Sequence, residues 1–395
     1  MTEVASPPVR FVTAPDGVRL AYAVAGNGPP LVWAAHWLTH LEFAWESPVW
    51  KHTMEFLTKH FTVIRYDERG CGLSDWTDQG LDLDTWVADL TAIVDALALD
   101  RFDLLGMSQG GPIAIEYAVR HPERVRNLIL AGTFSSGDFI PETQREALGR
   151  LMELHWGSSN PAFRQIFTSQ FIPNATEEQR NWFNELQAKS TSPALAAKLY
   201  AAIQRLDVRA RLPLVRAPTL VLHSRGDAAI PFSAGRALAT AIPQARLVPL
   251  PDDNHLPHAW SPAWPMFCRE IAAFTGVAYD GDAAPAATAT GAPQGAYRFG
   301  RCRLDSRSRE LIRDGKLVPL ESRAFDLLLF LLEHRDHAVS KDDIQNAVWP
   351  KMILTESALT RCVMKARKAV GDDPHRQEVI KTVHGHGYRF VARVS

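Results

Sequence analysis

The sequence predicts a large α/β domain, with a doubly wound and mostly parallel sheet and a helical cap, followed by a small α+β domain. Its 395 residues suit two domains better than one. Before residue 278, short apolar runs alternate with helical patterns, as in βαβ units. Residues 278–296 are almost all Ala, Gly, Pro and Thr and bury too little apolar surface to fold. They predict a flexible linker between domains at 1–277 and 297–395.

The composition is that of a soluble globular protein, with 46% hydrophobic and 22% charged residues. The sequence has no run of 18 apolar residues, and its first residues lack the apolar core of a secretory signal. We therefore expect a cytoplasmic protein with no membrane partner. The four cysteines show neither zinc-ligand nor disulfide spacing, and we expect no metal and no cofactor.

The net charge of -1 hides an asymmetry between the two halves of the chain. Residues 297–395 carry 19 Lys and Arg against 13 Asp and Glu, whereas residues 1–296 carry 24 against 31. A basic small half joined to an acidic large half predicts that only the small half binds a polyanion.

The large domain opens with a predicted hairpin, and its later strands are apolar throughout, which is typical of parallel strands covered on both faces. The predicted strands are Val9–Thr13, Val18–Val24, Leu31–Ala35, Phe61–Tyr66, Phe102–Gly106, Leu128–Ala131, Thr219–His223 and Arg246–Leu250. The predicted helices are Leu83–Leu97, Gly110–Arg120 and Ser233–Ala241. Residues 135–215 are mostly helical in pattern and rich in aromatic residues, which predicts a cap above the sheet.

The sharpest chemical motif is the G-x-S-x-G at Gly106–Gly110. It follows an apolar strand and opens a helix, which is the context that a nucleophile elbow requires. The tight turn holds Ser108 in a strained backbone conformation and projects its hydroxyl above the sheet, near the positive end of the helix. Ser108 is therefore the candidate nucleophile.

A serine nucleophile needs a base and a group that orients the base. Asp227 follows the strand that ends at His223, and His255 follows the strand that ends at Leu250. The chain order Ser108, Asp227, His255 is the order expected after a nucleophile elbow. His258 is an alternative base, and Asp138 is an alternative acid.

The oxyanion hole is expected to use the backbone N–H of Gln109 and one from the loop after Leu31–Ala35, which we assign to Trp37. Tryptophans crowd this part of the sequence, and they form either an aromatic pocket wall or ordinary core. They are Trp33, Trp37, Trp45 and Trp50.

On these motifs, residues 9–277 resemble the α/β-hydrolase superfamily. The stretch Asp67–Ser74 resembles the D-x-R-G-x-G-x-S turn of that family. The resemblance implies serine-dependent chemistry on a small acyl or ester-type molecule. The stretch His36–Glu42 replaces the usual His-Gly start of the oxyanion loop and resembles hydrolase-like domains fused to bacterial regulatory modules. Met107, Ser224 and Asn254 also depart from common family residues, but none of these departures removes a triad atom.

The small domain begins with short strand patterns, of which two are joined by a hairpin turn at Asp314-Gly315. The predicted strands are Tyr297–Phe299, Arg301–Leu304, Glu310–Arg313 and Lys316–Leu320. A first helix carries Phe325, Leu328, Leu329 and Leu332 at helical spacing. A second helix begins after Ser340 in a capping-box-like pattern, and a third runs from after Thr355 to about Val370.

The third helix of the small domain has two distinct faces. Its apolar stripe is made by Leu359, Val363, Ala366 and Val370. Its other face carries Ser357, Thr360, Arg361, Met364, Lys365 and Lys368. Such a polar, basic face suits phosphate contacts and hydrogen bonds to guanine edges in a major groove.

The chain ends in a predicted hairpin made by Val379–Val383 and Tyr388–Val394. His384 and His386 lie on its turn, and two histidines without further ligands do not predict a metal site. Residues 297–395 closely resemble the OmpR/PhoB-type winged-helix effector domain. The resemblance implies that the third helix enters the major groove of double-stranded DNA, with Lys381 and Arg389 as wing contacts, and that the protein binds repeated half-sites as a homodimer.

Our main hypothesis is a one-component transcriptional regulator whose hydrolase-like domain senses a small acyl or ester-type ligand, with or without hydrolysing it. The alternative is an active, esterase-like serine hydrolase with an accessory DNA-binding domain. A third hypothesis is a pure sensor that keeps the triad only as polar ligand-binding groups.

Overall fold

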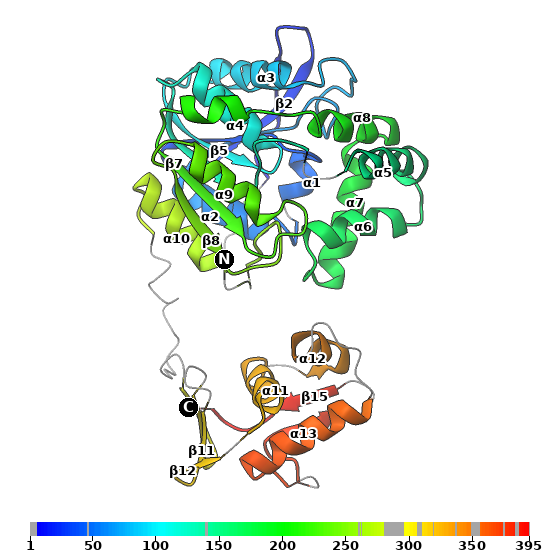
Figure 1. Ribbon diagram of the computed structural model, residues 1–395, viewed down its shortest axis with the longest axis vertical. Coiled ribbons are helices and arrows are strands. Elements are labelled where there is room, and N and C mark those ends of the chain that lie inside the picture. Colours follow the sequence, from blue (N-terminus) through cyan, green and yellow to red (C-terminus); the bar gives the residue numbers. More distant parts are fainter. Residues whose placement is uncertain are drawn as a thin grey trace. The chain divides into compact units, whose positions relative to one another are not determined.

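The computed structural model describes residues 6–45, 47–138, 141–259, 261, 263–279, 296–305, 310–318, 320–335, 338–348, 356–373, 376–383 and 387–394 (Figure 1). The chain divides into two compact units, Met1–Asp282 and Ala283–Ser395. Most of the predicted linker, residues 280–295, lies outside the described residues. At its edges, the Tyr279 ring packs against Phe56, and Ala296 begins a strand.

The first unit is built on an eight-stranded sheet with the order β1-β2-β4-β3-β5-β6-β7-β8. β1 and β2 are antiparallel, as are β2 and β4, and the remaining pairs are parallel. The strands are β1 (Arg10–Thr13), β2 (Arg19–Ala25), β3 (Pro30–Ala34), β4 (Thr62–Tyr66), β5 (Phe102–Met107), β6 (Val125–Ala131), β7 (Thr219–Ser224) and β8 (Arg246–Leu250). The predicted doubly wound, mostly parallel sheet is confirmed.

Helices cover both faces of this sheet and close two apolar cores. On one face lie α3 (Leu83–Ala96), α4 (Gly110–Arg120) and α9 (Phe232–Ala241). On the other lie α2 (Lys51–His60) and α10 (Ala263–Thr275). Three helices of this unit were not predicted: α2, α10 and the short α1 (Leu41–Trp45). α2 buries Met54, Phe56 and Leu57 within only ten residues, and α10 contains Pro265, a residue that is rare inside helices.

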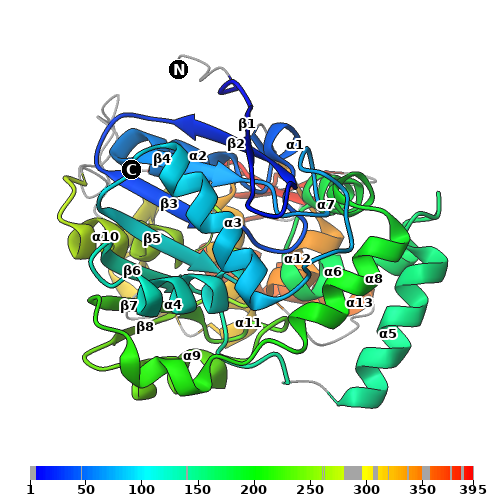
Figure 2. The ribbon, with the colours of Figure 1, turned by 90° about the horizontal axis from the view of Figure 1, so that it is seen from above.

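Between β6 and β7 the chain leaves the sheet and forms a group of helices, which both views show beside one end of the sheet (Figures 1 and 2). They are α5 (Glu142–His155), α6 (Ala162–Phe171), α7 (Glu177–Ser190) and α8 (Pro193–Ile203), followed by a 3-10 turn at Arg209–Leu214. The aromatic residues that suggested a cap mostly form its own core, since Trp156, Phe163 and Phe167 are buried together. Phe167 and Phe171 also reach the candidate site below.

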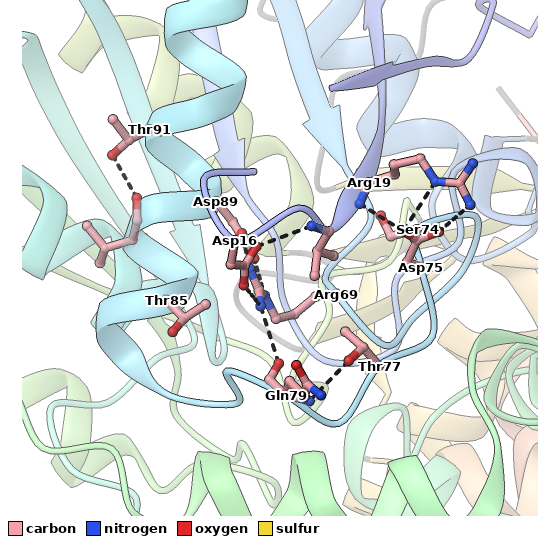
Figure 3. Close-up of polar contacts among 12 residues, drawn as sticks. Asp16, Arg19, Arg69, Ser74, Asp75, Thr77, Gln79, Thr85, Asp89 and Thr91 are labelled. Carbon is pink, nitrogen blue, oxygen red and sulfur yellow. Dashed lines mark hydrogen bonds and ion pairs between the residues drawn. The ribbon is translucent and has the colours of Figure 1, made fainter. Parts of the chain in front are cut away.

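A buried ion pair anchors the loop after β4. The Arg69 guanidinium donates two hydrogen bonds to the Asp89 carboxylate on α3, at 2.7 and 2.6 Å, and a third to Asp16 at 2.6 Å (Figure 3). The Arg69 and Asp89 side chains are 1% and 2% exposed. Figure 3 also shows an ion pair between Arg19 and Asp75, whose side chains are 69% and 35% exposed. The first pair therefore lies in the interior, and the second lies at the surface.

The second unit contains two antiparallel sheets around one apolar core. The four-stranded sheet has β9 (Ala296–Phe299), β10 (Cys302–Asp305), β11 (Glu310–Arg313) and β12 (Lys316–Val318), and the three-stranded sheet has β13 (Val339–Ser340), β14 (Ile380–Val383) and β15 (Gly387–Phe390). The helices are α11 (Ser322–Glu333), α12 (Lys341–Val348) and α13 (Glu356–Val370).

Local predictions for this unit are confirmed at the level of single residues. Asp314 and Gly315 both have positive φ, as a two-residue hairpin turn requires. The Ser340 hydroxyl accepts a hydrogen bond from the backbone N–H of Asp343 at 3.0 Å and so caps α12. Residues 349–355, which join α12 to α13, lie outside the described residues.

Candidate functional site

Ser108 lies in the turn between β5 and α4, as the motif predicted. Its φ of 51° is in the left-handed region, which costs free energy for a residue with a side chain. Glycines make the sharp turn possible. A Cβ at Gly106 would lie 2.8 Å from the Cβ of Ala114, and one at Gly110 would lie 2.8 Å from the carbonyl oxygen of Ala34. The strand β5 and the helix α4 therefore hold Ser108 in a strained backbone conformation.

Asp227 and His255 come together beneath the cap. The His255 ring contacts Asp227 through a hydrogen bond of 2.7 Å between Nδ1 and Oδ2. The other carboxylate oxygen, Oδ1, accepts hydrogen bonds from the backbone N–H groups of Ala229 and Ile230, both at 2.9 Å. A carboxylate fixed in this way orients the imidazole and favours the tautomer with its proton on Nδ1.

His255 Nε2 is buried, and no described group hydrogen-bonds to it. It belongs to a ring that lines a small cavity of about 30 Å³ together with Ser108. The structure records no hydrogen bond between the Ser108 hydroxyl and His255, which is common in ligand-free sites whose contacts shorten when substrate binds. The arrangement leaves Nε2 available as a proton acceptor beside the serine.

The two alternative residues lie in other surroundings. Asp138 is 57% exposed and forms an ion pair of 3.5 Å with Arg209. His258 is fully buried with Nδ1 3.4 Å from the Gln179 amide nitrogen, and burial lowers its pKa to about 4. The geometry therefore favours Asp227 over Asp138 as the orienting acid, and His255 over His258 as the base.

Ser108 also opens into a larger cavity of about 100 Å³ below the cap. Trp37 and Gln109, the two predicted oxyanion-hole residues, lie on its wall beside the serine. The Trp37 ring contacts the cap residues Trp156 and Phe167, with ring centroids 5.6 and 5.7 Å apart. The use of the Trp37 and Gln109 N–H groups as oxyanion donors stays a prediction.

Of the four tryptophans near the oxyanion loop, two belong to the core and two reach the wall of a cavity. Trp33 is core beneath a cation–π contact with Arg65, and Trp45 is core as well. Trp50 is buried but reaches the wall of the small cavity, whereas Trp37 lines both cavities. Beside them, burial lowers the pKa of His36 to about 4, so its ring is neutral at physiological pH.

Glu68 is a residue at the site that sequence reasoning missed. Its carboxyl accepts a hydrogen bond of 2.6 Å from the Gln109 side-chain amide, and its backbone N–H donates to the Thr39 hydroxyl at 2.9 Å. It therefore joins the nucleophile elbow to the oxyanion loop. Burial raises the pKa of Glu68 to about 8. The only sequence signal was its place inside the D-x-R-G-x-G-x-S turn, which does not indicate a contact with Gln109.

The third helix of the second unit, α13, has the two predicted faces. Leu359, Val363, Ala366 and Val370 are buried in the core of that unit. The exposed positions are Thr360, Arg361, Met364, Lys365 and Lys368. The side chain of Ser357 lies outside the described residues. The Lys365 ammonium forms an ion pair with the Glu321 carboxylate at 2.7 Å, so a DNA contact by Lys365 would have to replace Glu321.

The wing presents two cations side by side. Lys381 and Arg389 are directly opposite each other across β14 and β15, and both are exposed. A third basic residue, Arg367, points inward: its guanidinium donates to the carbonyl oxygen of Ile380 and to the Thr382 hydroxyl, at 2.7 and 2.9 Å. Arg367 therefore fixes α13 to the wing. His384 and His386 lie outside the described residues.

A protein-family model matches each of the two units. The family model described as alpha/beta hydrolase fold matches residues 43–262, and the chain belongs to this family. A second model, described as transcriptional regulatory protein, C terminal, matches residues 315–390. The chain is thus a fusion of an α/β-hydrolase domain with the C-terminal DNA-binding domain of transcriptional regulators.

Several proteins similar to this chain are described as hydrolases. The chain is 29% identical over 252 residues to the AB hydrolase superfamily protein YisY of Bacillus subtilis, covering 62% of this chain and 91% of that protein. It is 32% identical over 246 residues to 2-hydroxymuconate semialdehyde hydrolase of a Pseudomonas species, covering 58% and 82%. A solved hydrolase from Pseudomonas aeruginosa is 27% identical, with a TM-score of 0.59, and covers 68% of this chain and 98% of its own.

The described residues contain neither a membrane-spanning helix nor a metal-binding cluster. None of their helices is long and apolar enough to cross a lipid bilayer. Their His, Cys, Asp and Glu side chains form no group of three or more that could hold a metal ion.

Proposed function

We propose that the protein is a cytoplasmic, one-component transcriptional regulator whose hydrolase domain binds and hydrolyses a small acyl ester, and whose winged helix binds double-stranded DNA. The observation that carries the proposal is the presence, in one chain, of a DNA-binding domain and of a cavity lined by Ser108 and by His255, whose ring is held by Asp227. Ligand occupancy of the cavity changes DNA binding by a homodimer. No metal or cofactor takes part in the proposed reaction.

The proposed chemistry follows from the site geometry. The Ser108 hydroxyl attacks the ester carbonyl, and its proton passes to His255 Nε2. No described group hydrogen-bonds to this ring nitrogen. The carbonyl oxygen becomes negatively charged and is stabilised by the N–H groups of Trp37 and Gln109. His255 then gives the proton to the leaving alkoxide, and a water molecule that His255 deprotonates releases the acyl group from Ser108.

Labelling with a fluorophosphonate serine probe tests whether this nucleophile is assembled. We expect the full-length protein to be labelled on Ser108, located by mass spectrometry of its peptides, and Ser108→Ala to be unlabelled. The control is Ser169→Ala, since Ser169 is exposed on α6 and its hydroxyl bonds only the Gln165 carbonyl. If the folded wild-type protein stays unlabelled, the hydrolytic part of the proposal fails.

The DNA-binding part predicts a salt-dependent affinity for the DNA directly upstream of the gene. Each of Arg361→Ala and Lys381→Ala should reduce the slope of log affinity against log salt by about 1, because each removes one phosphate contact. Fluorescence anisotropy between about 50 and about 200 mM salt measures this slope. The matched control, Lys316→Ala, removes an exposed cation from the four-stranded sheet of the same unit. Equal slopes in all four proteins would contradict the assigned DNA face.

The second candidate function is an active serine hydrolase whose DNA-binding domain is only accessory. The strained φ of Ser108 and the 2.7 Å contact between His255 and Asp227 support hydrolysis in both candidates, because a site used only for binding needs neither. DNA binding measured with and without a hydrolysed ester separates the two. A change of affinity supports the regulator, and an unchanged affinity supports the accessory role.

A further inference from the structure

The cavity below the cap contains a polar group that the triad does not use. We propose that the Gln204 side-chain amide is a ligand-reading group, and that the site selects a short, uncharged acyl ester with a hydrogen-bond donor, such as a hydroxyl, on its acyl chain. This inference rests on the proposed function, because it names the ligand class of the same cavity.

Gln204 lies where its side chain can contact a bound acyl chain. It caps the C-terminus of α8, and its backbone N–H donates to the carbonyl oxygen of Tyr200 at 3.2 Å. Gly137, on the segment after β6, packs against its backbone so closely that a Cβ there would lie 2.8 Å from the Gln204 Cα. The residue is thus held between the cap and the sheet, on the wall of the same cavity as Ser108.

The carbonyl oxygen of the Gln204 amide has no partner in the described part of the protein. Gln204 is 9% exposed, and its Oε1 is buried with no hydrogen-bond partner among the described residues. Leaving such a buried acceptor unpaired costs free energy. A ligand O–H or N–H that reaches Oε1 recovers this cost, whereas an apolar ligand does not.

The rest of the cavity indicates an uncharged ligand. None of the described lining residues carries a charge, and most are apolar or aromatic. The polar lining side chains are Ser108, Gln109, Gln144, Gln170, Tyr200 and Gln204. Burial raises the pKa of Tyr200 to about 12, so its hydroxyl stays neutral. A ligand carboxylate would lose its hydration here without gaining a cationic partner.

The size of the cavity limits the acyl group. Its volume of about 100 Å³ is smaller than the roughly 150 Å³ apolar cavity that accommodates one benzene molecule. A chain of a few carbon atoms therefore fits, whereas a long fatty acyl chain would have to open the cap.

Three p-nitrophenyl esters test the inference with the full-length protein. The 3-hydroxybutyrate and 3-methylbutyrate esters differ only by a hydroxyl in place of a methyl group, and the succinate monoester carries a carboxylate. We expect kcat/KM for the hydroxy ester to exceed that for the methyl ester by about 10-fold, the worth of one hydrogen bond. The succinate ester should be the poorest substrate of the three.

Gln204→Met keeps the length of the side chain and removes its polar atoms. It should erase the preference for the hydroxy ester while Ser108 is still labelled by the fluorophosphonate. The control Gln244→Met makes the same change at an exposed position outside the cavity and should keep the preference. An unchanged preference in Gln204→Met, or a succinate ester hydrolysed as fast as the hydroxy ester, would overturn the inference.

A binding measurement separates this inference from the hydrolysis on which it rests. In Ser108→Ala, quenching of tryptophan fluorescence by the methyl esters of the same acids gives their Kd values, since Trp37 lines the cavity. Tighter binding of the hydroxy ester that is lost on adding Gln204→Met supports the ligand class even if wild type hydrolyses nothing. Equal Kd values for the two esters contradict it, whatever the labelling result.

Discussion

Replacing Asp227 with Asn is expected to reduce kcat for p-nitrophenyl butyrate by about 10⁴-fold, the loss known for the same change in a serine protease triad. In the structure, Asp227 accepts a hydrogen bond from His255 Nδ1 at 2.7 Å. The Ala229 and Ile230 N–H groups already occupy the Oδ1 side, so an Asn would keep its oxygen there and turn its NH₂ toward the ring. The ring would then carry its proton on Nε2 and could not accept one from Ser108.

The control for this prediction is Asp138→Asn, which changes the alternative acid in the same way. Asp138 is 57% exposed, pairs with Arg209 and lines neither cavity of Ser108, so we expect its loss to leave kcat close to that of wild type. Circular dichroism spectra should be the same for both variants and wild type. If Asp138→Asn loses more activity than Asp227→Asn, the assignment of the acid is wrong.

Replacing Arg69 with Met is expected to lower the free energy of unfolding by about 3–5 kcal/mol, because it leaves a buried carboxylate without its partner. The Asp89 side chain is only 2% exposed and receives two hydrogen bonds from Arg69. Burial already raises the pKa of Asp89 above its ordinary value, and without the guanidinium it should rise further. Urea denaturation followed by tryptophan fluorescence gives the free energy.

The pH dependence of this loss has a definite sign. In Arg69→Met, folded Asp89 keeps a proton at pH values where the unfolded carboxyl has lost it, so stability falls as pH rises above the unfolded pKa. The deficit relative to wild type should therefore be largest at neutral pH and shrink as pH is lowered toward 4, near the ordinary pKa of Asp.

Matched variants test the cause. Arg19→Met breaks the surface pair with Asp75 seen in the same region (Figure 3) and should cost much less stability than Arg69→Met, because solvent screens an exposed pair. Adding Asp89→Leu to Arg69→Met should restore stability, since it removes the unpaired charge. A loss in Arg69→Met no larger than in Arg19→Met would show that the buried pair is energetically unimportant.

Local patterns in the sequence predicted much of this protein. Short apolar runs in the sequence predicted the strands of both units. The helical stripe at Leu359, Val363 and Ala366 predicted the buried face of α13. The elbow around Ser108 was predictable because a strand, a tight glycine turn and a helix follow one another within a few residues. Each of these features depends on neighbours in the chain, which is where side-chain periodicity and turn geometry act.

The sequence by itself determined the two fold classes, the nucleophile elbow and the basic face of the last helix. Only the tertiary structure brought Asp227 to His255, placed Glu68 against Gln109, turned Arg367 inward, and brought Gln204 to the cavity of Ser108. These contacts join segments that are far apart in the chain. Asp, Glu, Arg and Gln also occur commonly in solvated loops and at helix ends, so the residue type alone does not predict such a contact. Burial and distance decide their roles, and neither is encoded in local spacing.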